Sequence, residues 1–203
     1  GGHLFVLYDG AVQADLRRVD TRHEQAATFA AEGWAKVTRR LGCAALTAGP
    51  GVTNGISAMT SAYLNGSPVC VIGGRAPHAR WGVGSLQELD HVPIVASITK
   101  HAATLETPDA VAPGLDAALF EAASPHRGPT FVDVPLDAWG ATSSTTVARE
   151  RAVALVSPAE ILEDLPLGPA REDAVLRHRA EGKAILDRED DRRIGIRTSA
   201  LTF

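Results

Sequence analysis

The sequence predicts an α/β protein in which helices cover both faces of a parallel sheet. Short apolar runs of strand length alternate with longer segments whose apolar residues recur at helical spacing. Glycine and proline separate the two kinds of segment. Buried strands that alternate with helices form βαβ units, and the right-handed crossovers of such units produce a parallel sheet. We therefore expect one sheet with helices on both faces.

Composition bounds the size of the protein and the class of its partners. The 203-residue chain is 45% hydrophobic and 22% charged, which is enough for one core and a short appendage. Its formal net charge of -4 gives no basic surface for nucleic acid or an anionic membrane. No apolar run approaches the roughly 20 residues of a membrane span, and the first residues lack a signal-peptide pattern. We expect a soluble, cytoplasmic protein that binds small molecules or other proteins.

The first predicted elements are a helix and a strand. Between residues 21 and 40 apolar positions recur at helical spacing with charged residues opposite them, which indicates a helix that Gly42 ends. The apolar run from Cys43 to Thr47 indicates a buried strand. Cys43 and Cys70 both lie in runs of this kind, so we expect two small buried hydrophobic side chains and no disulfide.

The next segments repeat the alternation. A second helix is expected from about Val52 to Leu64, and the turn residues at 65–68 lead into a strand at 69–72. Residues 73–85 hold four glycines and one proline, which predicts a loop.

A strand, a helix and a strand complete the predicted domain, at residues 101–105, 109–123 and 129–135. In open parallel sheets, ligands bind beyond the carboxyl ends of the strands. The loops at 48–54 and 73–87 would lie there, and they hold most of the polar and glycine residues.

The chain changes character after about residue 137. Residues 141–146 resemble a linker, and residues 149–203 are rich in charged residues, with an uninterrupted charged run that includes residues 188 to 193. Apolar side chains there are too sparse for an independent core. We expect a domain over residues 1–137, followed over 138–203 by a linker and a charged tail that is partly helical or disordered.

Two segments offer candidate ligand-binding groups. Glu24 lies between polar residues at the start of a predicted helix, where the helix dipole favours a carboxylate even without a function. The run Gly49 to Asn54 follows a strand and opens a helix, so its N–H groups could face a ligand. The alternative is a tight turn with Thr53 or Asn54 as the helix N-cap. The Lys-Ser/Thr pair of a phosphate-binding loop is missing.

A third segment, Leu86 to His91, places Glu88, Asp90 and His91 close together in the sequence. Neighbouring positions do not easily converge on one ion, so we expect a polar loop near a ligand and no metal site within this segment. No serine stands in a Gly-x-Ser-x-Gly elbow, so we do not expect a hydrolase.

Together these segments resemble the pyrimidine-binding domain of thiamine diphosphate enzymes. The resemblance is strongest to acetolactate synthase-like proteins, with 2-hydroxyacyl-CoA lyases and oxalyl-CoA decarboxylases as relatives, and it runs without gaps from residue 1 to about 137. Five segments support it: the glycine turn at 1–4, Arg-His-Glu-Gln-Ala-Ala at 22–27, Gly-Pro-Gly-Val-Thr-Asn at 49–54, Gly-Ser-Leu-Gln-Glu at 84–88 and the closing strand at 128–135.

The resemblance implies roles for five residues. Glu24 would be the catalytic glutamate that bonds a pyrimidine nitrogen of thiamine diphosphate and activates the cofactor toward a 2-oxoacid, with a pKa raised by burial. Gln87 would lie near the reacting atoms. Pro50, Gly51 and Asn54 would bind the pyrimidine with Glu24. With pyruvate the product would be acetolactate, in branched-chain amino acid biosynthesis.

The resemblance also implies partners from outside this chain. Family sites form between subunits, so a homodimer or homotetramer is expected. The Gly-Asp-Gly motif that holds Mg2+ and the diphosphate is not in the sequence, nor is the domain's first strand, so we expect half of an active site that needs a diphosphate-domain partner and is inactive alone. Nothing after residue 137 resembles a flavin domain, which leaves FAD binding open.

Two alternatives stay open. The first is a non-catalytic protein, either a truncated relic or a dimerisation module. The second is a lyase similar to 2-hydroxyacyl-CoA lyase or oxalyl-CoA decarboxylase, because Leu86 stands where acetolactate synthases usually have phenylalanine.

Overall fold

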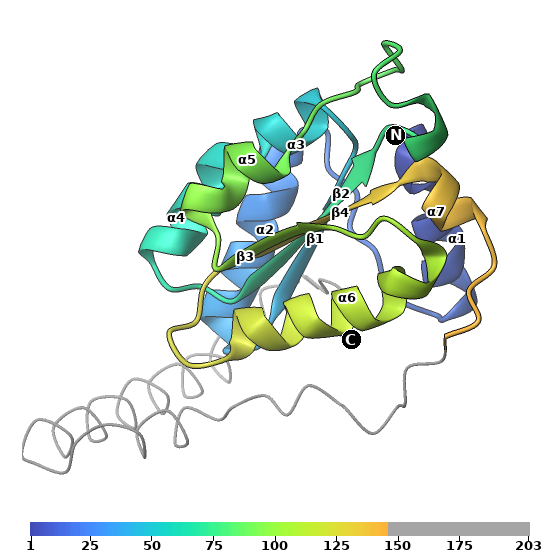
Figure 1. Cartoon of the computed structure of the whole chain (residues 1–203). Helices are drawn as coiled ribbons and strands as arrows, with labels where there is room; N and C mark the ends of the chain where they lie inside the picture. Colours follow the sequence, from blue (N-terminus) through green and yellow to red (C-terminus); the bar gives the residue numbers. More distant parts are fainter. Residues whose placement is uncertain (146–203) are drawn as a thin grey trace, which may run out of the picture. The chain divides into compact units, whose positions relative to one another are not determined.

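A computed structural model describes residues 1–145, which form a four-stranded sheet with helices on both faces (Figure 1). The strands are β1 (Gly42–Leu46), β2 (Val69–Arg75), β3 (His101–Thr104) and β4 (Thr130–Pro135). Their order in the sheet is β1-β2-β4-β3, and every neighbouring pair is parallel. The predicted α/β class is therefore confirmed, and β1 lies at one edge of the described sheet.

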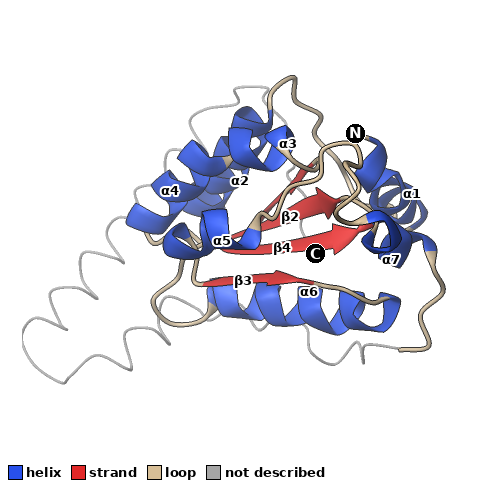
Figure 2. Ribbon diagram, turned by 45° about the horizontal axis from the view of Figure 1, so that its top comes forward, coloured by secondary structure: helices blue, strands red, loops and turns tan. Residues whose placement is uncertain are grey.

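Helices cover the two faces of the sheet in separate groups (Figure 2). One face carries α2 (Glu24–Thr38), α3 (Pro50–Asn54), α4 (Ile56–Leu64) and α5 (Val92–Val95). The other carries α1 (Phe5–Gln13), α6 (Pro108–Ala123) and α7 (Leu136–Gly140). Short 3-10 turns lie at η1 (Gly2–Leu4), η2 (His78–Arg80) and η3 (Ala96–Ile98).

Alternating strand side chains divide the interior into two apolar clusters. Ala44, Val71 and Phe131 pack toward α2 and α4, whereas their sequence neighbours Cys43, Cys70 and Val132 pack toward α6 and α7. This is the two-residue period of a strand that is buried on both faces. Both cysteines are free and buried, as expected.

Two predicted helix boundaries differ from the structure. The helix α2 ends at Thr38, with Arg39 in the left-handed conformation as its cap, so Gly42 does not end it. Gly42 begins β1, where a Cβ would collide with the carbonyl oxygen of Ala31 in α2. The single helix expected from about residue 52 to residue 64 is two helices, α3 and α4, which meet at Gly55.

One strand and the domain itself extend beyond their predicted limits. The strand β2 continues through Arg75, into the predicted loop, because its last residues still pair with β4. The helix α7 crosses the domain boundary expected at residue 137, and its Ala138 is buried in the second apolar cluster. The helix α1 was not predicted at all.

Part of the expected linker lies on the domain surface. Ser143 and Ser144 both donate hydrogen bonds to the carboxylate of Asp109, near the start of α6. Residues 146–203, which hold the expected tail, lie outside the described residues. Within residues 1–145, no helix is both long enough and apolar enough to span a membrane.

Candidate functional site at the carboxyl end of β1

Glu24 is the first residue of α2. His23 caps this helix, because the Gln25 N–H donates to its Nδ1 at 3.2 Å. The Glu24 carboxylate is half-buried, and Asn54 Nδ2 donates to its Oε2 at 3.0 Å. This hydrogen bond lowers the pKa of Glu24, and desolvation only partly opposes it. The raised pKa that we expected is therefore wrong for the described residues, because the carboxylate keeps contact with solvent and gains a donor.

The Gly-Pro-Gly turn connects β1 to α3. Gly49 has φ 59° and ψ -117°, the geometry of the first central residue of a type II′ turn, and the Gly51 N–H donates to the Ala48 carbonyl at 3.2 Å. Gly49 is the N-cap of α3, so the expectation of Thr53 or Asn54 as N-cap is wrong. Asn54 instead ends this short helix, which brings its amide to the carboxylate of α2.

The backbone of Gly51 packs closely against Thr47, near the carboxylate of Glu24. A Cβ on Gly51 would lie 2.5 Å from Thr47 Cγ2 and 3.6 Å from Glu24 Oε1. Glycine therefore lets the backbone of the turn approach both side chains. Pro50, which precedes it, begins α3 and is exposed.

Gln87 lies on the other side of the turn. Its φ of 58° is uncommon for a residue other than glycine. Thr47 Oγ1 donates to Gln87 Oε1 at 3.3 Å, and a Cβ on Gly49 would lie 2.8 Å from the Gln87 carbonyl oxygen. Leu86, the neighbour of Gln87, is 77% exposed. The structure thus gathers all the predicted site residues around the carboxyl end of β1.

Thr47 is a central residue of this cluster that sequence patterns did not single out. It contacts Gln87 on one side and approaches Gly51 on the other. Its position directly after a buried strand and before the glycine turn is the one signal that could have identified it.

A cavity of about 950 Å³ adjoins the cluster. Glu24 and Thr47 line one end of it, and the rest follows the open edge of β1 between α1 and α2. Its volume is within the roughly 300–1,000 Å³ of small-molecule sites. The other predicted site residues do not line this cavity, so only its end at Glu24 belongs to the candidate site.

A buried polar network lies behind the turn. His91 is fully buried; its Nε2 accepts from the Gly49 N–H at 2.8 Å, and its Nδ1 is 2.7 Å from Asp133 Oδ2. Because Nε2 accepts a hydrogen bond, the geometry assigns the ring proton to Nδ1, which donates to Asp133. Arg75 Nη1 lies 3.0 Å from the same carboxylate oxygen and 3.2 Å from Asp90 Oδ1. Residues 86–91 form the expected polar loop, outside helices and strands, but its last residue, His91, is buried.

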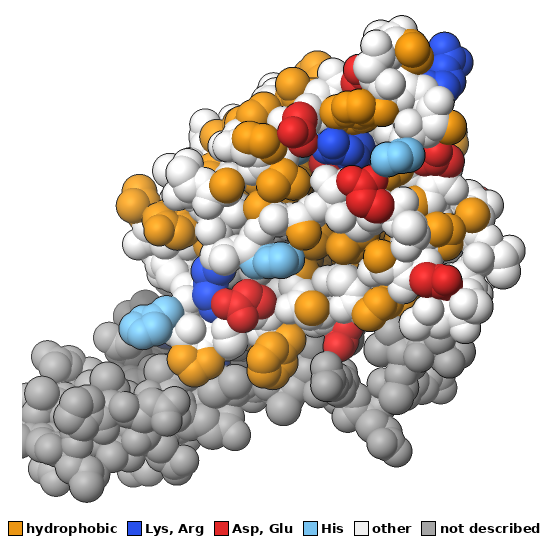
Figure 3. Space-filling view, in the orientation of Figure 1, with side chains coloured by type: hydrophobic (Ala, Val, Ile, Leu, Met, Phe, Trp, Pro, Cys, Tyr) orange, Lys and Arg blue, Asp and Glu red, His pale blue; other side chains and the backbone are white. Residues whose placement is uncertain are grey.

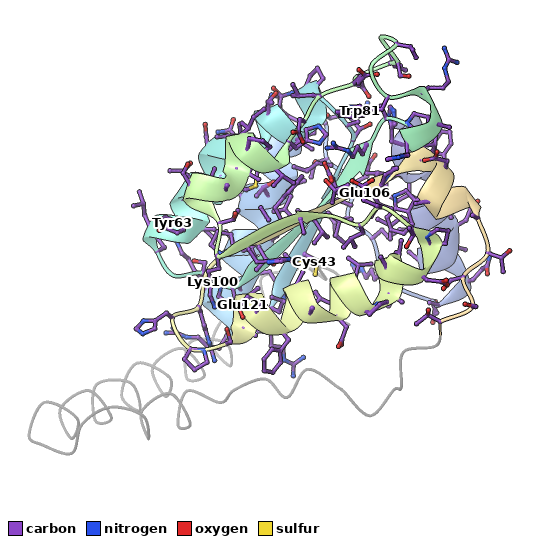
Figure 4. All side chains as sticks on the ribbon, in the orientation of Figure 1. Cys43, Tyr63, Trp81, Lys100, Glu106 and Glu121 are labelled. Atoms are coloured by element: carbon purple, nitrogen blue, oxygen red, sulfur yellow. The ribbon has the colours of Figure 1, made fainter. Side chains whose placement is uncertain are left out.

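The segment between β2 and α5 is held by its own side chains. Both carboxylate oxygens of Glu88 accept backbone N–H groups, from Gly82 and Ser85. The Trp81 ring stacks on the Arg75 guanidinium at 4.0 Å, a cation–π contact. Trp81 lies beyond the carboxyl end of β2 (Figure 4). Charged side chains gather in this part of the molecular face (Figure 3). Residues 1–145 contain no group of three or more His, Cys, Asp or Glu residues that could hold a metal ion.

Comparison with known proteins identifies the family. Residues 1–94 match the N-terminal TPP binding domain of thiamine pyrophosphate enzymes. The chain is 58% identical over 137 residues to a probable acetolactate synthase of Mycobacterium bovis and to an acetolactate synthase large subunit of Mycobacterium tuberculosis, covering 68% of this chain and 25% of each relative. It is 39% identical over 137 residues to 2-hydroxyacyl-CoA lyase 2 of Caenorhabditis elegans, covering 68% of this chain and 21% of that protein.

The chain thus spans about a quarter of the length of the curated relatives that it matches. The glutamate at the start of α2, the glycine turn after β1 and the parallel sheet are the features expected from the family resemblance. The chain belongs to the thiamine pyrophosphate enzyme family, as an acetolactate synthase-like N-terminal domain.

Proposed function

We propose that residues 1–137 form the pyrimidine-binding half of a thiamine diphosphate site in an acetolactate synthase-like enzyme. The position of Glu24 carries this proposal. Its carboxylate lies at the end of a cavity, accepts a hydrogen bond from Asn54, and lies close to the backbone of Gly51. A flat aminopyrimidine ring, with nitrogen atoms at its edge, fits a carboxylate in such a position. When bound, thiamine diphosphate supplies an electron sink for decarboxylation of a 2-oxoacid.

Glu24 would hold a proton at the pyrimidine nitrogen. Before binding, the hydrogen bond from Asn54 lowers the pKa of Glu24 and so favours the ionised carboxylate. A ring that covers the carboxylate removes water from it, and desolvation raises the pKa of a carboxyl group. Binding therefore favours a proton shared between the ring nitrogen and Glu24, which is the state that general acid–base catalysis needs.

Gln87 would contact the substrate. Its side-chain oxygen already accepts from Thr47, which leaves the amide N–H groups to donate to a substrate oxygen. Pro50 and Gly51 would form the wall of the pyrimidine pocket. In this proposal the 2-oxoacid is pyruvate and the product is acetolactate.

The diphosphate and Mg2+ would bind to another domain or subunit. Thiamine diphosphate is anionic, and Mg2+ requires oxygen ligands that residues 1–145 do not gather into a group. We therefore propose a homodimer or homotetramer in which a diphosphate-binding domain completes the site, and we expect the isolated chain to consume no pyruvate.

A second candidate function is 2-hydroxyacyl-CoA cleavage. The 39% identity to a protein of that name supports it, as does the exposed Leu86 next to Gln87. Product analysis of the completed assembly distinguishes the two functions. Pyruvate condensation yields acetolactate, whereas cleavage of the carbon–carbon bond of a 2-hydroxyacyl-CoA yields an aldehyde.

Calorimetric titration of the purified chain with thiamine diphosphate and Mg2+ tests the proposal. We expect saturable binding that Glu24→Gln abolishes. Glu121→Gln is the matched control, because this half-exposed glutamate pairs with Lys100 near the amino ends of the strands, away from the site (Figure 4). Absence of binding by the unmodified chain would contradict a preformed site and favour the non-catalytic alternative. Equal binding by Glu24→Gln would remove Glu24 from the site.

A further inference from the structure

We propose that His91 is a positioning residue: its hydrogen bond to Gly49 holds the glycine turn, and with it Asn54, against Glu24. The inference deepens the proposed function and rests on it for the catalytic role of Glu24. The positioning itself is a property of the folded chain and can be measured without cofactor.

The His91 side chain supplies a cap that α3 otherwise lacks. Helix N-termini leave N–H groups without intrahelical acceptors, and no side chain of the α3 N-cap residue provides one. The Gly49 N–H instead donates to His91 Nε2 at 2.8 Å, in a fully buried position. A buried N–H without an acceptor destabilises the folded state, so this hydrogen bond fixes the orientation of the Gly49 peptide.

The imidazole ring is itself fixed to the centre of the sheet. Its Nδ1 pairs at 2.7 Å with Asp133, a fully buried residue of the interior strand β4. The Arg75 guanidinium lies 3.0 Å from that carboxylate, and the Phe131 ring forms a T-shaped pair with the imidazole, with the ring centroids 6.1 Å apart. These contacts hold the imidazole ring in place, and the ring in turn holds the glycine turn against the interior of the sheet.

The position of Gly49 determines the position of Asn54. Both belong to the same short helix, with Gly49 as N-cap and Asn54 as the last residue of α3. Asn54 then donates to Glu24 Oε2 at 3.0 Å, the contact that contributes most to the lowered pKa of Glu24. His91 also follows Gln87 by four residues, so the same bond ties the Gln87 segment to the turn.

Two substitutions of His91 separate its hydrogen bond from its volume. His91→Phe keeps the ring and removes the acceptor. His91→Gln retains an acceptor and a donor. In the full chain, carbon NMR titration of labelled glutamate follows the Glu24 carboxyl, whose resonance is identified by its loss in Glu24→Gln. We expect the pKa of Glu24 to rise toward its ordinary value in His91→Phe and to return in His91→Gln.

Hydrogen exchange gives the second readout. The Gly49 amide should exchange roughly tenfold faster in His91→Phe, as expected for the loss of one buried hydrogen bond. Asn54→Ala is the matched control, because it removes the hydrogen bond through which His91 is proposed to affect Glu24. It should raise the pKa of Glu24 by itself, and His91→Phe added to it should cause no further rise. An unchanged Glu24 pKa in folded His91→Phe would overturn the proposal.

The unmodified chain provides a test even where His91→Phe does not fold. Nitrogen NMR of its histidines should show His91 with a proton on Nδ1 and an unprotonated Nε2 coupled to the Gly49 N–H. A protonated Nε2 would overturn the proposal, because that atom would then have no lone pair for Gly49. These measurements require no ligand, so a failure of thiamine diphosphate to bind would contradict the proposed function alone.

Discussion

Replacing Gly49 with alanine tests the turn at the centre of the candidate site. At φ 59° and ψ -117° the backbone lies in a region that side chains strongly disfavour, which costs about 1–3 kcal/mol. The added Cβ would also lie 2.8 Å from the Gln87 carbonyl oxygen, and overpacking of this kind costs about 1–3 kcal/mol. We therefore expect the free energy of unfolding to fall by about 2–6 kcal/mol.

Urea unfolding followed by circular dichroism measures this loss, and two glycines serve as controls. Gly84 has φ 75° but no atom within 4 Å of an added Cβ, so Gly84→Ala should lose only the strain contribution. Gly33, inside α2, also has open space, and Gly33→Ala should stabilise by about 0.5–1 kcal/mol. If Gly49→Ala unfolds at the same urea concentration as Gly84→Ala, the packing of the turn against Gln87 is refuted.

Two predictions concern groups away from the turn. Burial acts to raise the pKa of Glu32, but hydrogen bonds with Lys36 and with serine and asparagine side chains lower it overall. The stability that the ionised Glu32 side chain gives the fold is thus present above the ordinary pKa of 4.5 and is lost as the pH falls below it. The stability difference between the unmodified chain and Glu32→Gln should therefore shrink in acid. A difference that does not depend on pH contradicts this prediction. Burial raises the pKa of Cys70 to about 11 and also raises that of Cys43. Neither thiol should react with a thiol reagent in the folded chain near neutral pH, and rapid labelling before unfolding would disprove their burial.

Local patterns were sufficient for the elements with strong periodicity. The helix α2 and the strands β1, β2 and β4 each have an apolar pattern bounded by glycine, proline or a capping residue. The helix α1 was missed because its pattern is weak: Phe5, Val6 and Val12 are exposed and Gly10 interrupts its centre. The break at Gly55 was missed because it depends on contacts with β1 and α2.

The candidate site also has one part that local sequence patterns predict and one part that they do not. Glu24 and the Gly-Pro-Gly turn were predictable, because a carboxylate at a helix start and glycines between a strand and a helix are patterns within one short segment. The network of His91 was not, because 42 residues separate His91 from Gly49 and also from Asp133. No local spacing relates residues that only the folding of distant segments brings together.

The sequence by itself determined the α/β class, the order of the strands along the chain and the family to which the chain belongs. Only the tertiary structure decided the direction of the pKa shift of Glu24 and the partner of the Gly49 amide. The physical reason is that periodicity and turn chemistry act between near neighbours in the chain. A pKa and a buried hydrogen bond depend instead on distances in space, and for Glu24 the deciding distance is the 3.0 Å to Asn54, a residue 30 positions away.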